Sequence, residues 1–133
     1  MSQPPYLPAQ MDTLISPRLL RPLFWLLFAF ALTMALLPKP PSLPIDQFGD
    51  KFAHMLAFAA LAGVANLGWR HIPAWRIGLQ LAAFGALIEV LQMLPALHRD
   101  ADVRDWAADT AAIVAATLVA RGLARWFPLA QPQ

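Results

Sequence analysis

The side chains that could do chemistry in this chain stand at helical spacing within apolar stretches. Asp50, Lys51 and His54 occupy positions i, i+1 and i+4, so a helix would place all three within one turn. A carboxylate, an ammonium and an imidazole grouped in this way can bind a polar head group, and they can also exchange a proton. The simpler interpretation is a helix start at a membrane surface, with Asp50 stabilising the helix dipole and Lys51 extending toward water.

A second polar pair, Glu89 and Gln92, lies in an otherwise uncharged stretch. The two residues stand at i and i+3, and Gly85 precedes them by one turn on the same face, so a neighbouring helix could approach the acid closely. An ionisable group inside a membrane span costs about 2.5 to 3.5 kcal/mol and usually points toward a partner or water. Glu89 is therefore the strongest single indication of a site. The alternatives are a structural pair with His54 or Arg99, and a protonated, neutral Glu89.

Acidic residues recur at the start of the last apolar stretch. Asp102, Asp105 and Asp109 fall at i, i+3 and i+7, which predicts one polar helix face. Ala112 and Ala116 continue this face with small side chains that allow close packing. Asp102 and Asp105 also suit the capping of a helix, whereas Asp109 lies one turn too deep for that role.

Two arginines, Arg99 and Arg104, flank these acids in a loop long enough to fold back. A guanidinium can bridge a carboxylate or hold a phosphate, and both uses remain open. A metal site is not predicted, because the chain has no Cys and lacks a spacing such as His-Glu-x-x-His. No nucleotide loop or nucleophile elbow occurs in the sequence, so no cofactor and no catalytic residue is assigned.

Four apolar segments must position these polar groups. We expect transmembrane helices over about residues 19–37, 50–69, 76–95 and 105–124. The proline-rich residues 38–49 predict an extended connecting loop. The predicted fold class is all-α: an integral membrane four-helix bundle with short loops, occupying residues 18–127. Residues 1–17 are expected to form a flexible, disordered N-terminal tail, and residues 128–133 a short C-terminal tail.

Proline and tryptophan mark the predicted ends of these helices. Pro22 suits the first turn of the first helix, where its missing N–H costs nothing. An indole ring prefers the membrane interface, so all five tryptophans are interpreted as membrane anchors: Trp25, Trp69, Trp75, Trp106 and Trp126.

The composition favours lipid as the solvent of this protein. Of the 133 residues, 59% are hydrophobic and 14% charged, against about 25% charged in a typical soluble domain. A soluble helical bundle is the alternative, because the run 22–37 would rise only about 24 Å against a hydrocarbon core of about 30 Å. The net charge of +2 does not predict nucleic-acid binding, since Lys and Arg form no run or stripe.

The basic residues near the predicted helix ends also predict an orientation. Arg18, Arg21, Arg70, Arg76, Arg121 and Arg125 fall on one side, and Lys39, Lys51, Arg99 and Arg104 on the other. This excess of six against four predicts a multi-pass membrane protein with both termini in the cytoplasm and the polar residues on the outer side.

Three motifs in a fixed order resemble those of the VanZ-like membrane proteins. They cover about residues 38–120 and read Asp50-Lys51-x-x-His54, Glu89-x-x-Gln92, and Arg99 followed by Asp105-x-x-x-Asp109. The chain departs from the family where it has Asp109, often Asn, and where it has Ala112 and Ala116, commonly Gly. The resemblance implies a location in the cytoplasmic (inner) membrane and a link to resistance to the glycopeptide teicoplanin, but it supplies no defined reaction.

Three functions remain open. The first is non-enzymatic binding of a cell-envelope precursor or lipid head group, among membrane lipids, by the predicted polar cluster: Asp50, Lys51, His54, Glu89, Gln92, Arg99, Asp105 and Asp109. The second is a membrane-interface enzyme acting on a lipid-linked group, with Glu89 or Asp105 as general base and His54 as its partner. The third is a structural partner in an envelope complex, which would tolerate changes to the polar cluster.

Overall fold

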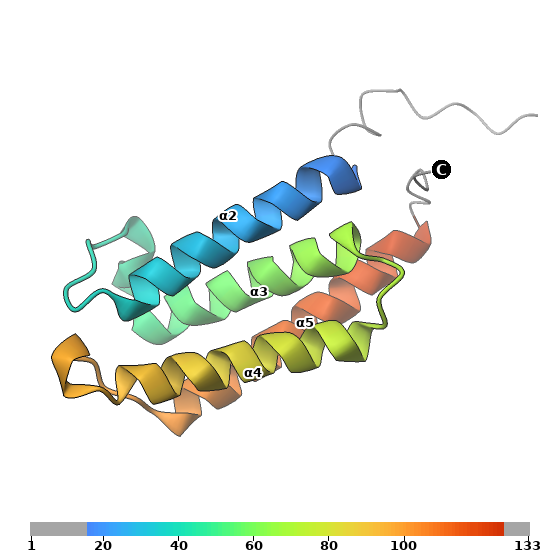
Figure 1. Cartoon of the computed structure of the whole chain (residues 1–133). Helices are drawn as coiled ribbons and strands as arrows, with labels where there is room; N and C mark the ends of the chain where they lie inside the picture. Colours follow the sequence, from blue (N-terminus) through green and yellow to red (C-terminus); the bar gives the residue numbers. More distant parts are fainter. Residues whose placement is uncertain (1–15, 127–133) are drawn as a thin grey trace, which may run out of the picture.

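The computed structural model describes residues 16–126, which form four long helices and two short 3-10 helices (Figure 1). The long helices are α2 (Pro17–Leu36), α3 (Asp50–Gly68), α4 (Ala74–Gln92) and α5 (Val103–Trp126), and the short ones are η1 (Pro44–Phe48) and η2 (Pro95–Leu97). The predicted all-α fold class is confirmed. The two predicted tails lie outside the described residues, apart from Ser16 and Pro17.

Each of the four long helices is long and apolar enough to cross a membrane. Their lengths of 19 to 24 residues correspond to about 29 to 36 Å, which matches a hydrocarbon core of about 30 Å. Large apolar side chains such as Leu26, Leu79 and Leu118 are at least 63% exposed on the outside of the bundle. The fold is that of a membrane-spanning protein whose apolar exterior is suited to lipid.

The first helix begins at Pro17, two residues before the predicted start at about residue 19. Ser16 is its N-cap, because the side-chain oxygen accepts the backbone N–H of Arg18 at 3.3 Å. Pro17 then occupies the first turn, the position that was predicted for Pro22. Pro22 lies inside the helix, where it cannot donate to the carbonyl of Arg18. The earlier start lengthens this span, so the mismatch with bilayer thickness that favoured a soluble bundle disappears.

The connection 38–49 is partly helical rather than extended throughout. Its second half forms η1, and the Asp46 carboxylate accepts the backbone N–H of Leu43 at 2.6 Å. Gly49 follows with a φ of 97°, a left-handed conformation that favours glycine. This turn places Asp50 at the first position of α3, as predicted.

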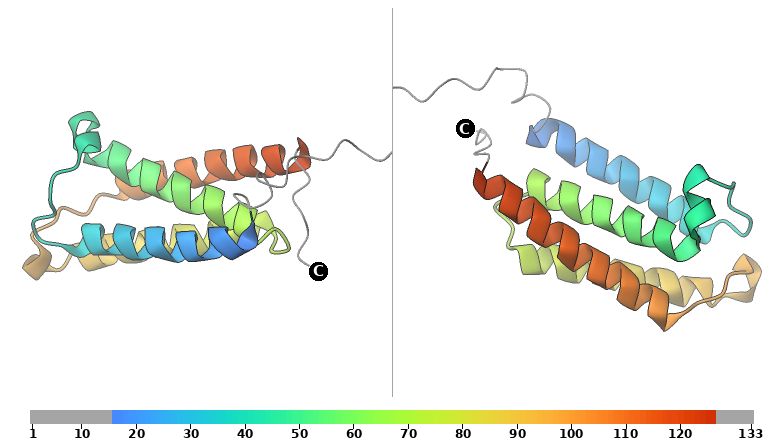
Figure 2. Two further views of the ribbon diagram at one scale, coloured as in Figure 1. Left: turned by 90° about the horizontal axis from the view of Figure 1, so that it is seen from above. Right: turned by 180° about the vertical axis from the view of Figure 1, so that it is seen from behind.

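The helices run in alternating directions, with α3 packed most extensively against α5 and next against α2 (Figures 1 and 2). In contrast, α2 and α4 meet over a small area. The core contains Phe24 from α2, Phe58, Leu61 and Ala62 from α3, Leu81 and Ile88 from α4, and Ile113 from α5.

Alternating helix directions give the bundle two chemically different ends. We call one the arginine end, defined by Arg18, Arg21, Arg70, Arg76, Arg121 and Arg125. We call the other the acidic end, defined by Asp50, Glu89, Asp102, Asp105 and Asp109.

Two of the five tryptophans are part of the helix packing. The Trp106 indole N–H donates to the carbonyl of Ala82 at 2.9 Å and so joins α5 to α4. Trp69 packs edge-on against Phe24, with ring centroids 5.3 Å apart. Trp106 and Trp69 therefore each have a specific partner in a neighbouring helix, a packing role that the anchor prediction did not include. Trp25, Trp75 and Trp126 remain 58 to 83% exposed.

Candidate functional site

At the acidic end, an ion pair joins the first turns of α3 and α5. Lys51 Nζ lies 3.3 Å from Asp105 Oδ1, and the two side chains are 50% and 29% exposed. It is the only salt bridge within residues 16–126. Partly exposed pairs of this kind contribute about 0.2 to 1 kcal/mol. The pair therefore positions two charges more than it stabilises the fold.

Glu89 is held by a backbone amide. Its Oε2 accepts the N–H of Asp102 at 3.0 Å. The structural alternative that paired Glu89 with His54 or Arg99 is thus wrong, because the loop before α5 brings an amide to this carboxylate. Glu89 ties the end of α4 to the beginning of α5.

Asp102 and Asp105, both considered as helix caps, have different roles. Asp102 directly precedes α5, and Arg104 lies in its first turn. The Oδ1 atom of Asp102 accepts the backbone N–H of Arg104 at 2.8 Å. This satisfies one of the first amides of the helix, as a capping residue does. Asp105 instead pairs with Lys51.

Gln92 is a structural link between α4 and α2. Its side chain is buried, and its Nε2 donates to the carbonyl of Ala35 at 2.9 Å. Carbonyls in the last turn of a helix have no partner within that helix. The amide of Gln92 therefore completes the end of α2 rather than facing a ligand.

Asp109 has the most unusual surroundings of the predicted polar cluster. It is 2% exposed, and its Oδ1 has no hydrogen-bond partner in the described part of the chain. Asp105 lies one turn earlier on α5, and both Glu89 and Asp105 are close enough to act on Asp109 electrostatically. Buried polar atoms are normally satisfied by a partner, so this oxygen requires an explanation.

Asp50 and His54 share a face of α3, as predicted, but they line a separate pocket. This small cavity of about 110 Å³ lies between α2, the η1 connection and α3, and it also includes Asp46. Among the described residues, no hydrogen bond joins His54 to Glu89 or Asp105. Arg99 makes no hydrogen bond or ion pair with any of residues 16–126. Lys51, Glu89, Asp105 and Asp109, from the predicted polar cluster, form the candidate site.

The described residues contain no group of three or more His, Asp or Glu side chains placed to hold a metal ion. The acids of the candidate site therefore present carboxylate oxygens to donors or cations without the convergent geometry of a metal centre.

A buried polar network at the arginine end was missed by the sequence analysis. Asn66 is fully buried, and its Nδ2 donates to the carbonyl of Ala62 at 2.7 Å and to Thr117 Oγ1 at 3.2 Å. Its Oδ1 accepts Arg121 Nε at 2.8 Å. The signal was present: Asn66 interrupts an apolar helix, and Thr117 and Arg121 stand one turn apart.

Arg121 also binds the turn between α3 and α4. Its two Nη atoms donate to the carbonyls of Arg70 and Ile72 at 3.0 and 2.6 Å. Arg70 in turn donates to the carbonyl of Ala124 at 2.9 Å. Two of the six arginines used to predict the orientation, Arg70 and Arg121, thus satisfy backbone carbonyls near the helix ends, and this network is structural.

No protein-family model matches the chain, and neither does any curated protein or solved structure. The similarity to VanZ-like proteins rests on the three sequence motifs.

Proposed function

We propose that this chain is a multi-pass membrane protein of the VanZ-like type that binds the head group of a lipid-linked cell-envelope component at its acidic end. The observation that carries this proposal is the buried Asp109 carboxylate, whose Oδ1 lacks a partner. A buried polar group without a partner costs about 1 to 3 kcal/mol. Proteins retain such a cost where a binding function uses the group.

The charges of the candidate site favour a hydrogen-bond donor as ligand. Three carboxylates, those of Glu89, Asp105 and Asp109, are grouped with a single ammonium, that of Lys51. Because Lys51 is engaged by Asp105 and Arg99 is not joined to the site, a phosphate would meet mainly negative charge. A hydroxyl or an ammonium group, such as those of an amino sugar, would donate the hydrogen bond that Asp109 Oδ1 lacks.

The arginine end supports the orientation of this binding protein. Basic residues accumulate on the cytoplasmic side of membrane proteins. With the arginine end inside, both termini are cytoplasmic, and the candidate site lies at the outer face of the cytoplasmic membrane. An outward site for envelope precursors would give the implied link to teicoplanin resistance a physical basis.

The test uses the substitution Asp109→Asn, which keeps the shape of the side chain and removes its charge. Thermal unfolding of the purified protein in detergent is measured with and without a polyprenyl-linked amino sugar. We expect the amino sugar to stabilise the wild type by about 2.7 kcal/mol at one hundred times its dissociation constant. The variant should unfold at the same or a higher temperature without ligand and should lose the ligand effect.

Two controls make this result specific. Polyprenyl phosphate without a sugar should not stabilise the wild type, and Asp100→Asn, an exposed acid at the same end, should keep the full ligand effect. If Asp109→Asn instead lowers the unfolding temperature strongly and keeps the ligand effect, Asp109 is a structural group and the proposal fails.

A further inference from the structure

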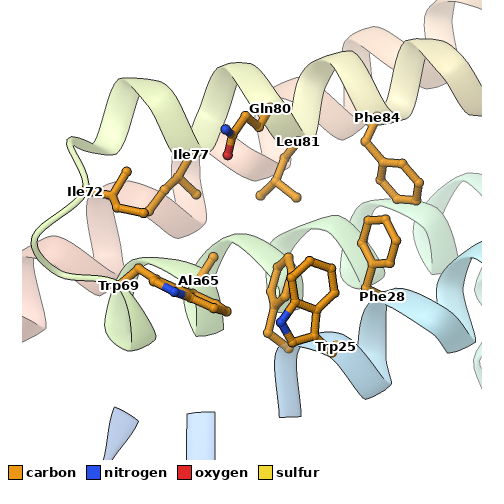
Figure 3. A pocket seen from close by; sticks show the side chains of 10 residues that line it. Trp25, Phe28, Ala65, Trp69, Ile72, Ile77, Gln80, Leu81 and Phe84 are labelled. Atoms are coloured by element: carbon orange, nitrogen blue, oxygen red, sulfur yellow. The ribbon is translucent and has the colours of Figure 1, made fainter. Parts of the chain in front are cut away.

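An apolar groove opens between α2 and α4 (Figure 3). Both helices pack on α3 but meet each other only over a small area, which leaves a cavity of about 400 Å³ between them. Its walls include Trp25, Phe28, Trp69, Leu81 and Phe84, and Gln80 is its polar residue. Phe28 and Phe84 stack at a centroid distance of 4.4 Å and bridge the two helices at one end of the groove.

Each helix that forms a wall of this groove has arginine near its start and an aromatic residue further along the same face. On α2, Arg18 and Arg21 precede Trp25 and Phe28 at spacings of three and four residues, which places all four on one helix face. On α4, Arg76 precedes Gln80 and Phe84 at spacings of four. Both α2 and α4 start at the arginine end (Figure 1). On α2 the arginines are followed by Trp25 and Phe28, and on α4 Arg76 is followed by Gln80 and then Phe84.

Arg21 lies at the mouth of the groove with hydrogen-bonding capacity to spare. Its guanidinium carbon is 5.5 Å from the centroid of the Trp69 ring, which lines the cavity. Its Nε donates to the carbonyl of Gly68 at 3.0 Å, while its two Nη atoms make no hydrogen bond within the described residues. The arginine is held in place by one bond and can offer two further N–H groups to an anion.

We propose that this groove binds one acyl chain of an anionic phospholipid, whose phosphate contacts Arg21 and Arg76. An apolar groove between membrane helices is filled by hydrocarbon, since water gains no partners there. Charge complementarity at the mouth selects the lipid, because arginines at a membrane surface attract anionic head groups. This site lies at the opposite end of the bundle from Asp109 and does not depend on the function proposed there.

The experiment is native mass spectrometry of the purified protein, titrated with dioleoyl phosphatidylglycerol or dioleoyl phosphatidylcholine. The two phospholipids have identical acyl chains, so a difference between their affinities reports the contribution of the head group. We expect phosphatidylglycerol to bind roughly thirtyfold more tightly, which is the combined effect of two arginines near a membrane surface. Glycerol phosphate, which has no acyl chains, should not bind measurably.

Charge-removing variants locate the head group. The double variant Arg21→Gln with Arg76→Gln should reduce the preference to within about twofold. Arg76→Gln alone should lose part of the preference. This change breaks no hydrogen bond within residues 16–126, but it removes the contact of the guanidinium with the neighbouring Trp75 ring, whose centroid lies 5.3 Å from the guanidinium carbon. The matched control is Lys39→Gln with Arg104→Gln, which removes two exposed charges at the other end of the bundle and should keep the preference.

A blocking variant locates the acyl chain. Gln80→Trp places an indole in the groove and should weaken binding of both phospholipids at least about fivefold, by displacing buried methylene groups. Leu87→Trp, which introduces the same ring at an exposed position of the same helix outside the groove, should not. Equal affinities of wild type for both lipids, or unchanged binding by a folded Gln80→Trp variant, would overturn the proposal.

Discussion

Asp109 and Arg121 are charged residues of the same helix whose surroundings are opposite. Asp109 is buried with an oxygen that has no partner in the described chain, whereas all three nitrogens of the Arg121 guanidinium are donors to protein oxygens. Residue type and depth alone do not separate these cases. The count of satisfied polar atoms does: the Arg121 guanidinium is fully used within the fold, whereas Asp109 retains an oxygen without a partner in the described residues, which is the basis of the proposed binding role.

At the residue scale, we expect Arg121→Ala to destabilise the bundle. The change removes three hydrogen bonds and leaves Asn66 Oδ1, which is fully buried, without its donor. The free energy of unfolding should fall by about 2 to 4 kcal/mol. Denaturant unfolding in detergent, followed by circular dichroism, measures this difference.

The control for Arg121 is Arg125→Ala, one turn later on α5. Arg125 is exposed and makes no hydrogen bond within residues 16–126, so its loss should change stability by less than about 0.5 kcal/mol. Equal losses in the two variants would show that charge at this end, and not the hydrogen-bond network, stabilises the fold.

At the scale of the helices, Gly85 sets how closely α4 approaches its neighbours. A Cβ atom at this position would lie 3.4 Å from both Phe58 on α3 and Trp106 on α5. The Trp106 indole bonds the carbonyl of Ala82, one turn from Gly85. The missing side chain therefore lets an aromatic ring from each neighbour lie against the α4 backbone.

This packing predicts a size limit at position 85. Gly85→Ala should change stability by less than about 1 kcal/mol, because its Cβ meets ordinary contact distances and alanine favours a helix. Gly85→Leu should cost about 1 to 3 kcal/mol, since Phe58 and Trp106 must move apart. Thermal unfolding in detergent tests both variants. Gly63→Leu is the control, with no atom near its Cβ, and a loss as large as that of Gly85→Leu would contradict this account.

The helices could be predicted more fully than their contacts. Apolar length predicted all four spans, and the start of α3 at Asp50 was predicted correctly. The start of α2 lies two residues before the predicted one, because Ser16 caps the helix and Pro17 occupies its first turn. Hydrophobicity shows where a span lies, whereas local hydrogen bonds decide where its helix begins.

The candidate site was predictable only within each helix. Helical spacing correctly grouped Asp50 with His54, since neighbours on one helix follow from periodicity. It could not show that Lys51 meets Asp105, or that Arg121 meets Asn66, which are separated by more than fifty residues in the chain. Those partners depend on helix rotation and packing, which spacing within one helix does not contain.

At the scale of the whole molecule, the two ends of the bundle suit different surroundings. Four alternating helices place the start of α2 and the end of α5 at the same end (Figures 1 and 2). That end carries six arginines, whereas the acidic end carries the candidate site. An asymmetry of this kind orients a protein in the membrane, and it predicts a cytoplasmic arginine end.

The orientation can be measured directly because the chain has no cysteine. Single cysteines at Asp100 and His71, exposed residues at the acidic and arginine ends, are treated in intact cells with a membrane-impermeant maleimide. We expect Asp100→Cys to be labelled, and His71→Cys only after permeabilisation; the cysteine-free wild type gives the background. The reverse pattern would place Asp109 on the cytoplasmic side, where a sugar displayed outside the membrane could not reach it. The ligand proposed for the acidic end would then be restricted to precursors still on the cytoplasmic leaflet, and the orientation predicted from the excess of basic residues at the arginine end would be wrong for this protein.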